Sequence, residues 1–144
     1  MKKFLVIAAL TLNMVGCASV NMATPQQDAT VKSFAAPKDN AGIYIYRNET
    51  MGSAVKMEVA VDGTPIGKTV AHTFLYKEVA PGKHTLTSSA ENTSTLEIDA
   101  KPGALYYVWQ EVKMGIMYAR TKLNLVDETE GKKGVLETKL AETK

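Results

Sequence analysis

The chain contains very little cysteine: Cys17 is the single cysteine among 144 residues. One cysteine cannot form a disulfide within the chain, so a disulfide-stapled fold is excluded. An excess of charge is also missing, because 17 lysines and arginines stand against 15 aspartates and glutamates. Nucleic-acid binding depends on clustered positive charge. We therefore expect no nucleic-acid partner.

The chain also lacks an apolar run long enough to span a membrane. The stretch FLVIAALTL, from Phe4 to Leu12, is followed by Asn13 and falls well short of the ~20 residues that a transmembrane helix needs. It comes directly after Lys2 and Lys3. A basic start, a short apolar run and a small residue at a cleavage point are typical of a secretory signal peptide. We predict that residues 1–16 form such a signal.

The residues before the cysteine resemble a bacterial lipobox, which has an aliphatic residue, a small or aliphatic residue, glycine or alanine, and then cysteine. Here the order is Met14-Val15-Gly16-Cys17, with methionine in place of the commoner leucine. The resemblance implies cleavage before Cys17, a diacylglycerol thioether on its sulfur and an acyl chain such as palmitate on its amine. Two or more acyl chains attach a protein stably to a membrane. The alternative is a buried free cysteine in an uncleaved helix.

The residue after the cysteine bears on which membrane is reached. It is Ala18 rather than aspartate, which resembles lipoproteins exported to the outer membrane. We therefore expect an outer-membrane lipoprotein that faces the periplasm.

Residues 17–40 are predicted to be the lipidated cysteine and a flexible tether. The sequence ASVNMATPQQDATVKSFAAPKDN is rich in alanine, threonine, proline, glutamine and asparagine and has no sustained apolar period. Docking of Val31 and Phe34 onto the domain would shorten the reach of this tether. Residues 41–144 are then left to form one domain, which is a usual domain size.

From Gly42 onward, short β-prone segments alternate with turn residues, which is typical of a sandwich or barrel. In GIYIYRN, Ile43 and Ile45 face one way and Tyr44 and Tyr46 the other, because side chains alternate along a strand. AVKMEVAVDG shows the same alternation of apolar and polar residues, as expected for a strand with one buried face. We predict an antiparallel β-sandwich of the immunoglobulin-like or transthyretin-like kind.

Turn residues divide the domain into strands. Asp62-Gly63 predicts a tight hairpin turn, since both residues tolerate positive φ. Pro81-Gly82 separates HTFLYKEV from KHTLTSSA, and we expect these two segments to pair as a hairpin. ALYYVWQEV, residues 104–112, is apolar on both faces and is predicted to be a central strand.

The C-terminal stretch DETEGKKGVLETKLAETK permits two interpretations. Asp127 followed by Glu130 fits a helix start, whereas Gly131 and Gly134 each cost a helix about 1 kcal/mol relative to alanine. The other interpretation is a turn at GKKG and a final strand. We favour a short C-terminal helix.

Four segments carry a resemblance to known families. VAVDGTPIGKT (residues 59–69) and VAPGKHTLT (residues 79–87) resemble the hairpin and corner of PEGA-type and carboxypeptidase-regulatory-like β-sandwich modules. Together with the lipobox, IYIYR (residues 43–47) and PGALYYVW (residues 102–109), they resemble the bacterial lipoprotein family DUF2846. The resemblance covers about residues 41–140 and implies a β-sandwich. It implies no activity, because the function of the family is not established.

Catalytic and metal sites have little support in the sequence. His72 and His84 are the two histidines, and neither lies at metal-ligand spacing from another histidine, a cysteine or a pair of carboxylates. A G-x-S-x-G motif and the glycine-rich phosphate-binding loops are absent. We expect no enzyme activity, no cofactor and no metal.

Aromatic residues on strands are the one feature that suggests binding, because such faces recognise glycans and proteins. The candidate binding surface comprises Tyr44, Tyr46, Tyr76, Tyr106 and Trp109; the alternative is that most of them fill the core. The favoured hypothesis is a non-catalytic binding or accessory module for an envelope protein or glycan, through this face or through an edge strand. The alternatives are a small periplasmic hydrolase or an inhibitor of an envelope hydrolase, and a purely structural role.

Overall fold

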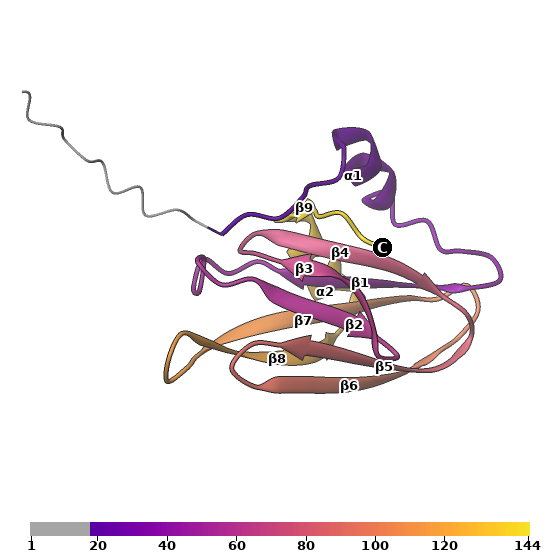
Figure 1. Cartoon of the computed structure of the whole chain (residues 1–144). Helices are drawn as coiled ribbons and strands as arrows, with labels where there is room; N and C mark the ends of the chain where they lie inside the picture. The colour runs from indigo at the N-terminus through magenta and orange to yellow at the C-terminus, as the bar shows by residue number, and fades with distance from the viewer. Residues whose placement is uncertain (1–17) are drawn as a thin grey trace, which may run out of the picture.

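Two β-sheets pack face to face in the computed structural model, which describes residues 18–144 (Figure 1). The helices and strands are α1 (Pro25–Val31), β1 (Ala41–Arg47), β2 (Met57–Val61), β3 (Thr64–Thr69), β4 (Thr73–Val79), β5 (Gly82–Ser89), β6 (Thr93–Ala100), β7 (Leu105–Met114), β8 (Ala119–Val126), α2 (Glu128–Leu136) and β9 (Lys139–Leu140). One sheet has five strands in the order β8-β7-β1-β4-β9, and the other has four in the order β3-β2-β5-β6. The predicted β-sandwich is confirmed.

The prediction that all strands are antiparallel is wrong for two pairs. Strand β1 pairs in parallel with β7, and β4 pairs in parallel with β9. A parallel pair needs a long connection, and the chain between β1 and β7 contains the strands β2 to β6. Alternation of side chains along one strand carries no information about the direction of its neighbour, so the sequence pattern could not reveal this.

Strand β1 lies at the centre of the five-stranded sheet and separates two apolar layers. Ile43 and Ile45 are fully buried between the two sheets, in the larger hydrophobic cluster. Tyr44 and Tyr46 point to the other side and belong to a second cluster under the helices. Burial of each isoleucine stabilises the fold by about 1.5–3 kcal/mol. The predicted alternation along β1 is confirmed.

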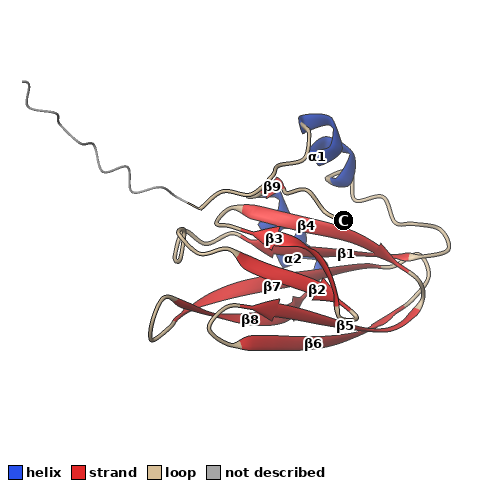
Figure 2. Ribbon diagram, in the orientation of Figure 1, coloured by secondary structure: helices blue, strands red, loops and turns tan. Residues whose placement is uncertain are grey.

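Helix α2 covers the outer face of the five-stranded sheet (Figure 2). The helix begins after Asp127, whose carboxylate accepts a hydrogen bond from the Glu130 amide at 2.8 Å. Gly131 and Gly134 face the sheet, where a Cβ atom would lie 2.2 Å from Tyr107 and 2.1 Å from Tyr46. The predicted helix is therefore present, and its glycines permit close packing. The competing interpretation also holds in part, because the short strand β9 follows.

Residues 18–40 are folded against the domain, so the prediction of a flexible tether is wrong for this stretch. Thr24 caps helix α1 in a reciprocal capping box with Gln27. The Asp28 carboxylate then accepts a hydrogen bond from the Leu140 amide at 2.8 Å. Val31 and Phe34 pack against the second hydrophobic cluster. Burial of these two side chains stabilises the docked segment, although its overall composition is polar.

The tight turn at Asp62-Gly63 is confirmed, with φ values of 51° and 80° in the hairpin of β2 and β3. The hairpin predicted around Pro81-Gly82 is wrong. Strand β4 pairs with β1 and β9, whereas β5 pairs with β2 and β6. The chain therefore crosses from one sheet to the other at Pro81. The prediction failed because a proline and a glycine suit such a corner as well as a hairpin turn.

The central position predicted for residues 104–112 is confirmed, since β7 lies between β8 and β1. Within residues 18–144, no helix is long and apolar enough to cross a membrane.

Candidate functional site

The described chain begins at one end of the sandwich. The Ala18 amide donates a hydrogen bond to the Ser53 carbonyl at 3.2 Å, and Ser53 lies in the loop between β1 and β2. Cys17 itself lies outside the described residues. The same end carries the turn between β5 and β6 and the loop between β7 and β8 (Figure 1). We call this part of the molecule, residues 18, 48–56, 90–92 and 115–118, the Ala18 end.

A buried arginine shapes the loop that meets Ala18. Arg47 is fully buried, and its Nη2 atom donates to the Gly52 carbonyl at 2.6 Å. Its Nη1 atom donates to the carbonyls of Val55 at 2.7 Å and Thr69 at 3.3 Å. Burial lowers the pKa of this guanidinium, and the nearby charge of Glu49 acts in the opposite direction. This role is not evident from the sequence, because an arginine at a strand end usually points into solvent.

Two carboxylates fix the neighbouring loops. The Glu49 carboxylate accepts a hydrogen bond from the Val112 amide at 2.8 Å. The Glu91 carboxylate accepts from the Met117 amide at 2.6 Å and from the Tyr118 amide at 3.3 Å. Hydrogen bonds from amides to charged acceptors are among the stronger ones in proteins. The loops at the Ala18 end are therefore held in defined shapes.

A chain of polar side chains crosses the core behind this end. Thr69 donates to Gln110 at 2.5 Å, and Gln110 donates to Ser88 at 2.7 Å. The Ser88 and Thr121 hydroxyls are 2.7 Å apart. All four side chains are buried, and buried polar groups are tolerated when they are paired in this way. This network fixes how the two sheets pack on each other, and no local pattern in the sequence reveals it because its members lie on four different strands.

The structure does not bring the predicted aromatic residues together on a surface. Tyr44 and Tyr46 are 1% and 2% exposed, so they belong to the core and the prediction is wrong for them. The Tyr44 ring stacks on Tyr107 with centroids 5.2 Å apart, and its hydroxyl donates to the Val31 carbonyl at 2.7 Å. Burial raises the pKa of Tyr46 to about 12, with a smaller effect of Glu130.

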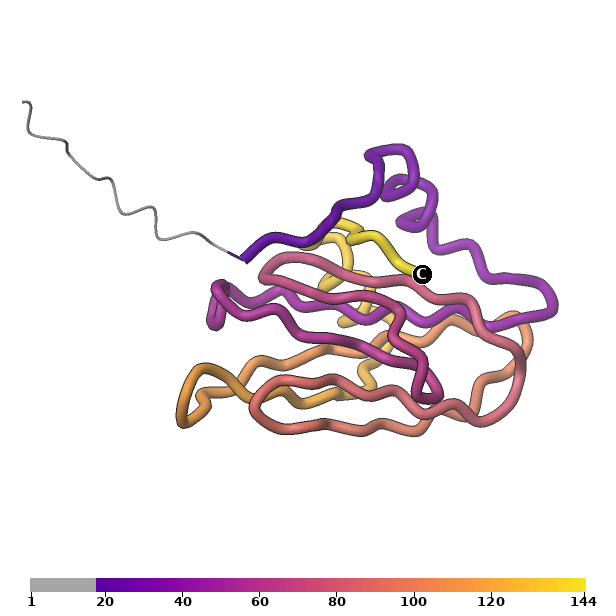
Figure 3. Tube along the Cα trace, in the orientation of Figure 1, coloured from indigo at the N-terminus to yellow at the C-terminus, as the bar shows by residue number. Residues whose placement is uncertain are grey.

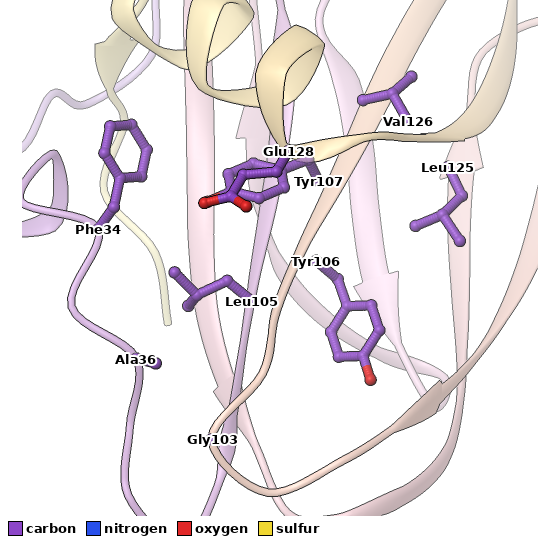
Figure 4. A pocket seen from close by; sticks show the side chains of 9 residues that line it. All are labelled: Phe34, Ala36, Gly103, Leu105, Tyr106, Tyr107, Leu125, Val126 and Glu128. Atoms are coloured by element: carbon purple, nitrogen blue, oxygen red, sulfur yellow. The ribbon is translucent and has the colours of Figure 1, made fainter.

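The other three candidates, Tyr76, Tyr106 and Trp109, are half-buried. Tyr106 lines an open hollow of about 410 Å³ beside α2, in which Figure 4 shows Leu105 and Phe34 on one side and Leu125 on the other. The Tyr106 hydroxyl is engaged, since it donates to the Asp99 carbonyl at 3.1 Å and accepts from the Lys101 amide at 2.9 Å. Leu125 is 53% exposed. Tyr76 and Trp109 line other hollows, so the three half-buried aromatic residues reach the surface at separate places.

The two histidines lie far apart in the fold and have different partners. The Nε2 atom of His72 lies 3.0 Å from the Thr50 hydroxyl. His84 lies between two acceptors, with Nδ1 2.6 Å from the Asp62 carboxylate and Nε2 2.6 Å from the Ala80 carbonyl. These hydrogen bonds, the one to Asp62 first, raise the pKa of His84 above 6.5. Hydrogen bonds from the Thr85 amide and then from His84 lower the pKa of Asp62.

A general base needs a ring nitrogen with a free lone pair. Because both nitrogens of His84 face acceptors, the ring is held as a proton donor on both sides. The pair therefore stabilises the corner at Ala80 rather than providing a base. Within the described part of the chain, residues 18–144, no group of three histidine, cysteine, aspartate or glutamate side chains is placed to hold a metal.

Each of the four edge strands, β3, β6, β8 and β9, makes at least one hydrogen bond with another part of the same chain. The Lys144 amide donates to the Ile66 carbonyl of β3 at 2.8 Å, and the Ala23 amide donates to the Leu140 carbonyl of β9 at 3.0 Å. On the other side of the sandwich, the Leu123 amide of β8 donates to the Ser94 hydroxyl of β6 at 3.0 Å.

Comparison with known proteins assigns a family to this architecture. Residues 37–122 match the model of the family described as "Protein of unknown function (DUF2846)", a stretch that runs from before β1 into β8. A protein of Haemophilus influenzae described as "Uncharacterized protein" is 34% identical over 137 residues, covering 94% of this chain and 82% of its own length. No solved structure matches the chain. On the strength of the matched domain, the chain belongs to the DUF2846 family.

Proposed function

We propose that this protein is a lipoprotein of the bacterial envelope, anchored in the outer membrane through Cys17 and facing the periplasm. In our proposal it acts there as a non-catalytic binding or accessory module. The observation that carries the anchor is the place of Ala18, which is tied to Ser53 at one end of the fold. Ala18 directly follows the lipobox cysteine in the sequence, so the proposed lipid would be attached one residue before a backbone that is fixed to the domain.

The physical chemistry of acyl chains supports this anchor. Each buried methylene contributes about 0.8 kcal/mol, and two or more chains make attachment stable. Because residues 18–40 pack on the domain, the domain would be held close to the bilayer rather than at the end of a long tether.

The test of the anchor is metabolic labelling with palmitate followed by mass spectrometry of the N-terminal peptide. We expect the wild-type chain to carry label and a diacylglyceryl group, and Cys17→Ala to carry neither. Density fractionation of the membranes should place the wild type with the outer membrane. An unlabelled wild-type chain would refute the proposal.

For the binding role, the most suitable surface is the hollow beside Tyr106 and Leu125. It is open, it measures about 410 Å³ and it combines aromatic and aliphatic walls, as glycan and protein sites often do. Leu125 and Leu136 are both exposed leucines, at 53% and 59%, but only Leu125 lines this hollow.

The matched pair Leu125→Ser and Leu136→Ser therefore tests the surface. Pull-downs from envelope extracts and sedimentation with purified peptidoglycan should recover a ligand with the wild type and with Leu136→Ser. Recovery should drop with Leu125→Ser. Equal recovery with both variants would remove the hollow from the proposal, and failure to recover any ligand with the wild type would refute the binding role.

A further inference from the structure

The end of β7 and the loop that follows it, residues 114–118, display four large apolar side chains to solvent. Met114 is 84% exposed, Ile116 is 93%, Met117 is 83% and Tyr118 is 57%. Loop tips are normally polar, and a cluster of exposed apolar side chains marks a site of interaction. Met51, in the loop between β1 and β2, is 54% exposed as well.

The apolar tip is held rigidly by the domain behind it. The carboxylate of Glu91 receives the amides of Met117 and Tyr118, and the Glu91 amide donates to the Ala119 carbonyl at 3.1 Å. Gly115 passes so close that a Cβ there would lie 1.5 Å from the Glu91 carboxylate. The negative charge therefore faces inward, toward backbone amides, while the apolar side chains face outward.

The tip lies at the Ala18 end, where the chain leads to Cys17. The loop that receives Ala18 packs on the same hairpin: a Cβ built on Gly52 would lie 3.1 Å from Val112 and 3.7 Å from Ala119. Figures 1 and 3 show the start of the described chain, the β1–β2 loop and the β7–β8 loop at one end of the sandwich. The opposite end carries the turns at Asp62-Gly63, Pro81 and residues 101–104.

Positive charge lies directly behind the apolar tip. Lys113 and Arg120 are exposed cross-strand neighbours at the base of the β7–β8 loop, and Lys113 is paired with Glu111 at 3.3 Å. Long basic side chains next to inserted apolar residues reach the phosphate layer of a membrane. Tyrosine, with an apolar ring and a polar hydroxyl, is itself typical of that interface.

We propose that the β7–β8 loop, together with Met51, inserts into the interface of the phospholipid leaflet that holds the Cys17 lipid. The loop then acts as a second contact that fixes the orientation of the domain. This inference rests on the proposed anchor at Cys17. The occupant of the patch is the bilayer surface, because Ala18, the residue that follows the proposed lipid-bearing cysteine, is bonded to the loop at this end of the fold.

The experiment uses the full chain with an acylated Cys17, which leaves an introduced cysteine as the one free thiol. Ile116→Cys and Met51→Cys are labelled with an environment-sensitive fluorophore and reconstituted in vesicles of phosphatidylethanolamine and phosphatidylglycerol. Thr64→Cys, an exposed position next to the turn at the opposite end, is the matched control. Each of these exposed positions tolerates cysteine without loss of core packing.

We expect a blue shift, quenching by doxyl-labelled phospholipids and protection from aqueous iodide at positions 116 and 51. The probe at position 64 should show no blue shift, no quenching by doxyl-labelled phospholipids and full quenching by iodide. Equal iodide quenching at all three positions would overturn the proposal. So would iodide protection at position 116 without quenching by doxyl lipids, because a second copy of the protein would then cover the loop.

The same preparations separate this inference from the anchor. Mass spectrometry of the N-terminal peptide reports whether Cys17 carries a diacylglyceryl group. If the lipid is present and the position 116 probe is not quenched by doxyl lipids, the loop insertion fails while the anchor stands. If the lipid is missing, the anchor fails, and insertion from that anchor fails with it.

Discussion

At the scale of single residues, polar side chains in unexpected places determine the geometry of this protein. His84 and Asp62 join the Ala80 corner to the β2–β3 turn, although their spacing in the sequence suggests no pairing. Arg47 follows an aromatic strand and is buried among backbone carbonyls. The His84–Asp62 pair and Arg47 therefore hold loops and turns in place.

The raised pKa of His84 predicts a pH dependence of stability. The folded protein binds the proton more tightly than the unfolded chain, so the stabilisation is complete below about pH 6.5 and is lost as the pH rises through the higher pKa of the folded state. The midpoint of thermal unfolding, followed by circular dichroism, should therefore decline in the range just above pH 6.5. His84→Gln should flatten that decline. A wild-type midpoint that does not change across this range would contradict the assignment.

Arg47→Met should destabilise the fold and loosen the loop that meets Ala18. Methionine fills much of the space but leaves the partly buried carbonyls of Gly52 and Val55 and the buried carbonyl of Thr69 without the guanidinium donor, at a cost of about 3 kcal/mol in the free energy of unfolding. Urea denaturation measures this loss. Arg120→Met, at an exposed position, should change the free energy of unfolding by no more than about 0.5 kcal/mol. Similar values for the two variants would show that the buried contacts contribute little.

The sequence predicted which side chains share a face of each strand. It did not predict which of the apolar faces are buried under another element. Tyr44 and Tyr46 satisfy the pattern of an outer strand face and equally that of a layer under a helix. The decision between surface and core depends on α2 and on Phe34, which are distant in sequence. Burial of Arg47 could not be predicted either, because its partners are backbone atoms of a loop.

At the scale of elements, α2 shows why helix propensity alone left the C-terminal stretch undecided. Propensity assigns a cost to Gly131 and Gly134 and takes no account of the distance between a helix and a sheet. Here the missing Cβ atoms let the helix approach Tyr107 and Tyr46. The N-cap at Asp127, in contrast, was readable from sequence because capping is local.

Gly131→Ala should therefore lower stability, although the same change in an exposed helix raises it. The new Cβ would lie 2.2 Å from Tyr107, and overpacking of this kind costs about 1–3 kcal/mol. Thr129→Ala, an exposed position of α2, is the matched control and should leave stability unchanged or slightly higher. Chemical denaturation of both variants measures the difference. A Gly131→Ala protein as stable as the control would show that the helix can move away from the sheet without penalty.

At the scale of the whole molecule, the first and the last described segments of the chain are hydrogen-bonded to each other. The Glu142 amide donates to the Asn21 carbonyl at 2.9 Å, and Met22 forms an isolated β-bridge with Ala141. The sequence indicated that the domain is a sandwich, because alternation and turns are local signals. It could not indicate that β4 and β5 enter different sheets, since this depends on contacts between distant residues. It named Val31 and Phe34 as the residues through which residues 18–40 would dock, and both pack on the domain, but composition alone favoured the tether.

Removal of residues 141–144 should weaken the fold and release its first residues. The truncated chain loses the amide donors to Phe74, Asn21 and Ile66, at about 1 kcal/mol for each hydrogen bond. Hydrogen exchange should become faster at residues 18–24, and the thermal midpoint should fall. Glu142→Ala keeps every backbone bond and should change neither quantity. Unchanged exchange in the truncated chain would mean that α1 alone holds the N-terminal segment.

The contact between these two segments also determines when folding can be completed. Strand β1 needs β7 beside it, and β4 needs β9 from the end of the chain. Folds built on pairings between distant segments form slowly, because long loops must close before the pairing is gained. A nascent chain that still lacks residues 139–144 has neither β9 nor the hydrogen bonds to Asn21 and Ile66. In such a chain the edge of β4 that faces β9 has no neighbour, so the last pairing of the five-stranded sheet is also the last step that folding can complete.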